Sequence, residues 1–269
     1  MQIVAKYEGM DADQNQLPAI EVGESLTGIG RSLVIMSNYL AEGRIRKRAP
    51  YPQLSRVYLR PLKPGSVDAV FQVFIDPQHL LTLGQWAASG IVGGVAFLLF
   101  RSVWNRAVGS AFGSDHNDLK GLFDGRRGDI DALVDAIEPA LREAHRPITI
   151  GAINININHG KQKIVQFNPS TKRFVETKIK KPDLEDVELS TASYNANTRY
   201  GRVFDFTLGR TVAFTLHRDA TSGSVDVVTE SLRTYATTGQ GRMIATLKRT
   251  QDLDGRDKHY TIFSARNLK

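Results

Sequence analysis

A cluster of cationic, aromatic and amide side chains in the C-terminal part of the chain offers the clearest chemistry in the sequence. Within 17 positions it holds Tyr194, Asn195, Asn197, Thr198, Arg199, Tyr200, Gly201, Arg202 and Arg210. Arginine presents a rigid fork of donors to phosphate, tyrosine offers a ring face to a base, and amides can read base edges. The cluster predicts a nucleotide-binding site made of Asn197, Arg199, Tyr200, Arg202 and Arg210. Under the alternative, the arginines only flank the start of a strand and the tyrosine packs against the protein.

Motifs for catalysis and metal binding are absent from the sequence. There is no G-x-x-x-x-G-K-[ST], no strand-linked G-x-G-x-x-G, no G-x-S-x-G and no H-E-x-x-H. The six histidines are scattered singly, and the lack of cysteine excludes disulfides and thiol catalysis. Gly28 and Gly30 lie inside a helical pattern, where small residues serve packing. No catalytic residue, metal or cofactor is expected, and the protein is predicted not to be an enzyme.

The elements expected to position the cluster are the strands of a small β-barrel. Residues 202–216, RVFDFTLGRTVAFTL, are predicted to form two strands joined by a short turn, with Phe204 pointing inward and Asp205 outward. One helix is expected over 225–236, and a last hairpin about Asp254-Gly255. Several short strands with a single helix favour a barrel, an architecture that often binds oligonucleotides.

Strands and helices alternate in the preceding part of the chain. Strands are predicted over 2–7, 57–62 and 67–75. Apolar residues recur every three or four positions over 22–40, which predicts a helix that stops at Gly43. A second amphipathic helix is expected over 129–145 and is ended by Pro147, the predicted domain boundary.

An uncharged apolar stretch is the most unusual segment of the chain. Between His79 and Arg101 lie 21 residues without a formal charge, LLTLGQWAASGIVGGVAFLLF. As a helix it would be about 31 Å long, close to the hydrocarbon thickness of a bilayer. Trp86 and Trp104 lie near its ends, as interfacial residues do. The prediction is a membrane-inserting helix, and the alternative is the buried centre of a soluble domain or of an oligomer.

Small residues in this stretch predict that the helix associates with copies of itself. Gly90 and Gly94 are in G-x-x-x-G register, which lets helix backbones approach closely inside lipid. Several copies would be needed to enclose a pore, because each chain offers one such helix. Large apolar groups could form its constriction and a cation its mouth. The residues assigned to the channel and to helix packing are Trp86, Gly90, Gly94, Phe97 and Arg101.

Charge is distributed unevenly along the 269 residues. Residues 1–146 hold 16 basic and 16 acidic side chains, whereas residues 147–269 hold 19 and 12, so the formal +7 belongs to the C-terminal part. A basic domain attracts polyanions such as nucleic acid, nucleotides or acidic headgroups. The alternative is a basic surface that serves only solubility.

These observations together predict an α+β protein organised in four segments. They are an N-terminal α+β domain, an apolar candidate membrane or oligomerisation helix, a connector with a helix, and a basic β-rich ligand-binding domain with the barrel. Their predicted bounds are 1–76, 77–109, 110–146 and 147–269.

Two sets of motifs resemble a known family of bacterial anti-phage proteins. From Asn195 to Lys258 the chain carries N-x-x-T-R-Y-G-R-V, G-R-T-V-A-F-T-L, E-S-L and D-G-R-D-K. Its N-terminal part carries K-Y-E-G, S-L-x-G-I-G-R-S-L and P-G-S before the apolar segment. This combination resembles the membrane effectors of Hailong-type defence systems.

The resemblance implies an oligomeric channel in the bacterial inner membrane, with its soluble domains in the cytoplasm. A DNA-like oligonucleotide on the C-terminal domain would hold the channel shut, and infection would remove it. The implied partners are further copies of the chain, a single-stranded oligonucleotide or nucleotide, membrane lipid and a nucleotidyltransferase encoded nearby. The alternative function is that of a soluble oligomeric nucleic-acid-binding protein with a buried central helix.

Overall fold

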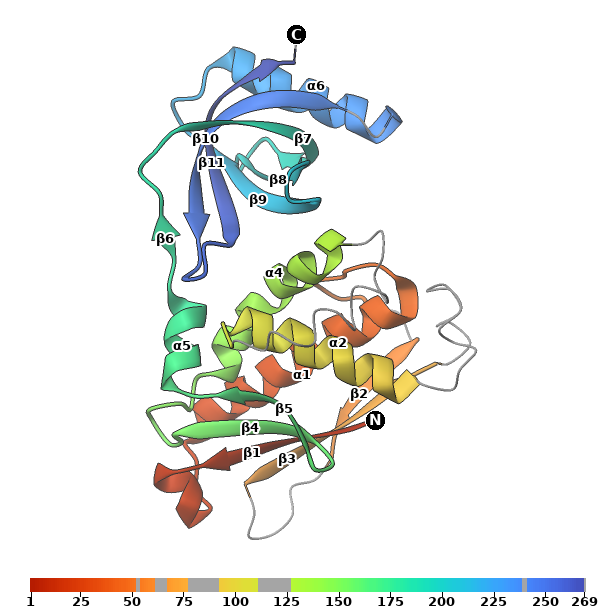
Figure 1. Cartoon of the computed structure of the whole chain (residues 1–269), viewed down its shortest axis with the longest axis vertical. Helices are drawn as coiled ribbons and strands as arrows, with labels where there is room; N and C mark the ends of the chain where they lie inside the picture. The colour runs from red at the N-terminus through yellow and green to blue at the C-terminus, as the bar shows by residue number, and fades with distance from the viewer. Residues whose placement is uncertain (52–53, 61–66, 77–91, 111–126, 239–240, 269) are drawn as a thin grey trace. The chain divides into compact units, whose positions relative to one another are not determined.

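The computed structural model describes residues 1–51, 54–60, 67–76, 92–110, 127–238 and 241–268 (Figure 1). It divides into two compact units. The first unit comprises residues 1–124 and 133–176, and the second comprises residues 125–132 and 177–269. Residues 147–176, which the sequence analysis assigned to the C-terminal domain, therefore belong to the first unit.

The first unit is built on a five-stranded antiparallel sheet. Its strands are β1 (Gln2–Glu8), β2 (Ser55–Leu59), β3 (Asp68–Ile75), β4 (Asn154–His159) and β5 (Gln162–Phe167). They lie in the order β2-β3-β1-β4-β5. The first four strands and their helical connections follow the ferredoxin-like β-α-β-β-α-β pattern, and β5 extends the sheet beyond β4. Alternation along β1 buries Ile3, Ala5 and Tyr7, as expected of a sheet with one covered face.

Helices complete the core of the first unit. They are the short η1 (Met10–Gln14), α1 (Ala19–Glu42), α2 (Val92–Ala107), residues 133–144 of α4 (Arg127–Ala144) and α5 (Pro169–Glu176). The predicted end of the first long helix is confirmed, because Gly43 has a left-handed φ of 68° and donates its N–H to the Tyr39 carbonyl at 2.7 Å. Gly28 on α1 lies so close to α4 that a Cβ would sit 2.3 Å from the Ala140 carbonyl oxygen.

The described part of the apolar stretch is packed against the first unit itself. In α2, which lies beside α1 in Figure 1, Leu99, Phe100, Val103 and Trp104 are fully buried. The Trp104 Nε1–H donates to the Ser32 Oγ at 3.2 Å, so this indole belongs to the protein core. Along the described parts of the chain, no helix has the length and apolar character needed to span a bilayer. The predicted transmembrane helix, and with it the predicted inner-membrane location, is therefore wrong.

The residues assigned to a channel differ in exposure where the structure describes them. Gly94 is exposed on α2, whereas Phe97 and Arg101 are half-buried, with the guanidinium 6.0 Å from the Phe97 ring centroid. Trp86 and Gly90 lie outside the described residues. The physical reason for the correction is the pattern of α2, whose large apolar side chains repeat on one side and are covered by protein rather than lipid.

The second unit contains a closed five-stranded barrel, which confirms the predicted β-barrel. The strands are β7 (Glu185–Asn195), β8 (Tyr200–Asp205), β9 (Arg210–Leu216), β10 (Arg242–Gln251) and β11 (Asp257–Asn267). They close in the order β7-β8-β9-β11-β10-β7, and only β9 and β11 are parallel. The helix α6 (Ser222–Thr238) connects β9 to β10, and the short β6 (Ile179–Lys180) pairs beside β10. This topology is that of the oligonucleotide/oligosaccharide-binding (OB) fold.

The barrel interior corrects one predicted register. Val203 and Asp205 on β8 point inward and are fully buried, whereas Phe204 is half-buried on the outside. The prediction had this alternation shifted by one residue, because it treated the aromatic side chain as core and the carboxylate as surface. Phe214, Leu247 and Tyr260 are among the fully buried residues that fill the barrel.

Candidate nucleic-acid interface

The outer surface of β8, β9, β11 and the neighbouring part of β10 gathers aromatic, basic and hydroxyl side chains. Tyr200 pairs with Thr215 across β8 and β9, and Thr215 pairs with Thr261 across β9 and β11. In the next row Arg202 and His259 both lie opposite Ala213. We call this surface the aromatic–basic face. Its members are Tyr200, Arg202, Thr215, Lys248, His259, Thr261 and Phe263.

Two pairs of stacked rings lie along this face. Tyr200 is 48% exposed, and its ring stacks on that of His259 with ring centroids 6.2 Å apart and planes at 21°. Phe263 stacks on His217 at 4.4 Å, and the Lys248 Nζ lies 5.7 Å from the Phe263 centroid. Burial, and to a smaller extent the charge of Lys178, lower the pKa of His259 to about 4. The imidazole is therefore neutral at physiological pH and presents an uncharged ring.

Arg199 holds the loop that delivers Tyr200 to β8. Its φ of 54° is left-handed, and its Nη1 donates to the carbonyl oxygens of His217 and Arg218, both at 2.8 Å. The preceding turn is closed by Asn195, whose Oδ1 accepts the backbone N–H of Asn197 at 3.0 Å. Arg199 is therefore a positioning residue for the face.

Arg202 lies on the face and is anchored to the neighbouring strand. Its Nη2 donates to the Thr211 carbonyl oxygen at 2.9 Å, and its Nε donates to the Thr211 Oγ1 at 3.2 Å. The side chain is half-buried. These contacts orient the guanidinium along the outer surface of the barrel.

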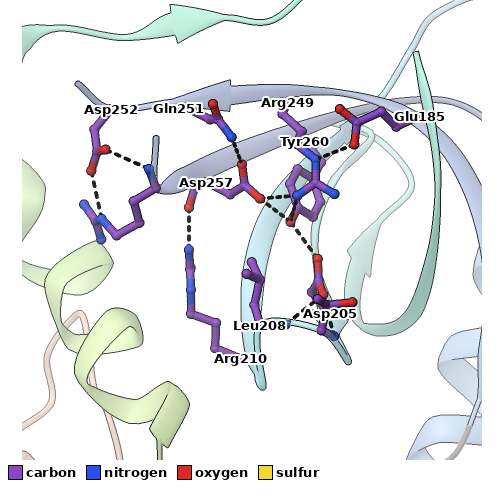
Figure 2. A network of polar contacts seen from close by, with 11 residues as sticks. Glu185, Asp205, Leu208, Arg210, Arg249, Gln251, Asp252, Asp257 and Tyr260 are labelled. Carbon is purple, nitrogen blue, oxygen red and sulfur yellow. Dashed lines mark hydrogen bonds and ion pairs between the residues drawn. The ribbon is translucent and has the colours of Figure 1, made fainter. Parts of the chain in front are cut away.

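Arg210 lies in a different environment from the other four predicted site residues. It is 3% exposed, and its Nη2 donates to the Asp257 carbonyl oxygen at 2.6 Å (Figure 2). Figure 2 shows that it belongs to a network that also contains Asp205, Arg249 and Tyr260. Thus the structure brings Asn197, Arg199, Tyr200 and Arg202 to one face and its loop, and places Arg210 in the buried network.

The buried network neutralises its own charges. The Tyr260 hydroxyl donates to the Asp205 Oδ2 at 2.7 Å, and the Asp205 Oδ1 accepts the backbone N–H of Leu208 at 3.0 Å. Arg249 pairs with Asp257 and with Glu185. Burial raises the pKa of Tyr260, and the neighbouring carboxylates raise it further. Opposite charges and donors therefore balance one another, which gives the network a structural role.

Most of the aromatic–basic face was missed by sequence reasoning, which assigned only Tyr200 and Arg202 of its seven members to a binding site. Lys248, His259 and Phe263 follow the predicted cluster by about 50 residues, and β11 joins β9 in a parallel pairing between strands that are not consecutive. The available signal was the alternation of the last hairpin, which places these side chains on its outer side. In the described part of the chain, no three His, Asp or Glu side chains are grouped as a metal site requires.

Two family models match this chain. Residues 3–176 match a domain of unknown function (DUF7946), and the match ends at the last residue of the first unit. The chain belongs to the DUF7946 family. Residues 183–266, which contain the barrel, match a second family of unknown function (DUF7947). No curated protein and no solved structure gives a significant match.

Proposed function

We propose that this protein binds single-stranded nucleic acid on the aromatic–basic face of its barrel. The observation that carries the proposal is the exposed Tyr200 ring, stacked beside a neutral His259 and next to Arg202. Bases stack on such rings whatever their sequence, because every base has a π-face. Tyr200 and Arg202 lie on β8, the second strand of the barrel, and the second and third strands form the binding face of the OB fold, which supports the proposal by analogy.

The charge of the second unit supports moderate rather than strong phosphate binding. With the unit boundary at residue 176, residues 177–269 hold 15 basic and 11 acidic side chains. This excess of four is smaller than that of the predicted domain, because the basic residues of 147–176 belong to the first unit. Stacking is therefore expected to contribute a large share of the affinity, with Arg202 and Lys248 contacting phosphates.

Substitution of Tyr200 tests the proposal. Removing a stacked ring costs about 1–3 kcal/mol, so Tyr200→Ala should weaken binding by roughly 5- to 150-fold. Tyr200→Phe keeps the ring and should bind within about twofold of the natural protein. The measurement is fluorescence anisotropy of the full chain with a labelled single-stranded oligonucleotide of about 12 nucleotides. Equal affinity of the alanine and phenylalanine variants, or no binding by the natural protein, would contradict the proposal.

The same titration compares DNA with RNA. The resemblance to Hailong-type effectors implies a DNA-like ligand, so we expect single-stranded DNA to bind at least as tightly as RNA of the same sequence. A duplex should bind more weakly than either strand, because its bases are already stacked in pairs. A role in anti-phage defence stays a prediction from that resemblance.

A further inference from the structure

The strand β2 lies at one edge of the first sheet. Among the described residues it pairs only with β3, and without a register shift. Arg60 donates its N–H to the Val70 carbonyl, and the Leu54 carbonyl accepts the N–H of Asp76. Even-numbered residues therefore bond to β3, and the N–H and C=O groups of the odd-numbered residues 55, 57 and 59 point away from it.

Large apolar side chains are exposed beside this edge. Tyr58 and Leu59 are each 49% exposed, and Phe74 on the neighbouring strand is 52% exposed. The Tyr58 and Phe74 rings meet edge to face at 5.9 Å. Arg56 lies opposite Phe74 in the ladder, and its Nη1 donates to the Tyr58 hydroxyl at 3.4 Å. Natural edges are usually protected by proline, bulges or several charges, and β2 has neither a proline nor a bulge.

We propose that β2 pairs in antiparallel fashion with β2 of a second copy of this chain. The two five-stranded sheets then form one continuous sheet across a two-fold axis. The N–H and C=O groups of residues 55, 57 and 59, which point away from β3, would form the new ladder. This inference does not depend on the proposed nucleic-acid binding, because it concerns the first unit alone.

Charge selects the register of this pairing. If the axis passes through Val57, Arg56 of each copy faces Tyr58 of the other, as a non-hydrogen-bonded pair with closely spaced side chains. A guanidinium over a tyrosine ring is attracted by its quadrupole. An axis through Tyr58 would instead bring Arg56 against Arg60, and an axis through Arg56 would bring two Arg56 side chains together. The register through Val57 pairs all five residues SRVYL with one another and places each Arg56 opposite a Tyr58.

Sedimentation equilibrium of the full chain tests the proposal by measuring the dimer Kd of variants that carry new charges at positions 56 and 58. The natural protein should be a dimer. Tyr58→Lys places a lysine opposite Arg56 at two symmetric positions and should raise the dimer Kd by about tenfold or more. Adding Arg56→Glu to that variant creates opposite charges at the same positions and should restore the dimer. Both side chains are exposed, so the fold of the monomer should persist, which far-ultraviolet circular dichroism checks.

A matched control removes an exposed leucine elsewhere. Leu184 lies in the second unit and is 55% exposed. The substitution Leu184→Lys should therefore leave the dimer Kd unchanged. Three outcomes would overturn the proposal: a natural protein that is monomeric at all concentrations, a dimer that Tyr58→Lys leaves intact, and a double variant that stays as weak as Tyr58→Lys. Loss of oligonucleotide binding by Tyr58→Lys without a change of mass would assign the exposed rings to nucleic acid instead.

Discussion

His145 links the stability of the first unit to pH. It is fully buried, its Nδ1–H donates to the Leu141 carbonyl at 2.7 Å, and its Nε2 lies 3.0 Å from the Thr171 Oγ1. Burial lowers the pKa of this imidazole to about 4. The folded protein therefore keeps His145 neutral at pH values where the unfolded chain, with a pKa of about 6.5, already takes up a proton.

The expected result is a loss of stability on acidification. The contribution of His145 is complete above about pH 6.5 and is lost as the pH falls from there to about 4, by about 3 kcal/mol in total. Urea unfolding followed by tryptophan fluorescence measures it, because Trp104 lies in the same core. His145→Gln should be less stable at pH 7 and should show a flatter pH profile. An unchanged profile in that variant would assign the acid sensitivity to other groups.

At the scale of elements, the contact of α1 with α4 depends on a missing side chain. In Gly28→Ala the new Cβ would lie 2.3 Å from the Ala140 carbonyl oxygen and 2.5 Å from the Ala144 backbone nitrogen. Backbone atoms of a neighbouring helix cannot rotate away as a side chain can. We therefore expect a loss of about 2 kcal/mol or more in the free energy of unfolding, because the helices must separate.

Gly23 on the same helix is the matched control. It is exposed, and an added Cβ would meet no atom within 4 Å. Gly23→Ala should therefore stabilise the protein by up to about 1 kcal/mol through helix propensity. Urea unfolding of both variants gives the comparison. Similar effects of the two substitutions would mean that α1 and α4 do not approach at Gly28 as closely as described.

At the scale of the whole molecule, the modest net charge sets the salt dependence of nucleic-acid binding. If Arg202 and Lys248 supply most of the phosphate contacts, the logarithm of the affinity should fall with the logarithm of salt concentration with a slope of about −1 to −2. Lys248→Gln should reduce the size of this slope by about 0.7. Arg233→Gln removes an equal charge from α6, where Arg233 pairs with Glu230, and should leave the slope unchanged. Equal slopes for all three proteins would place the phosphates away from Lys248.

Local patterns in the sequence were sufficient for much of the fold. The apolar repeat over 22–40 and Gly43 predicted α1 and its end, and Asp254-Gly255 predicted the turn between β10 and β11, where Gly255 has a φ of 78°. These features depend on neighbouring residues and on backbone conformation, which the sequence expresses directly. The same holds for Tyr200 and Arg202, which lie two residues apart on one strand and so share a face.

Contacts between distant segments were decided only by the tertiary structure. The apolar stretch around α2 has the same hydropathy whether lipid or protein covers it. The hydrogen bond from Trp104 to Ser32 shows that protein covers its described part. Arg202 on β8 and Arg210 on β9 are both strand residues, yet Arg210 is buried with Asp257 and Arg202 lies on the outer face. The sequence by itself predicted α1, β1, β3 and the last hairpin, together with Tyr200 and Arg202 of the candidate binding face. Strand pairing decided the rest, because β11 reaches β9 only after α6 and β10 have intervened.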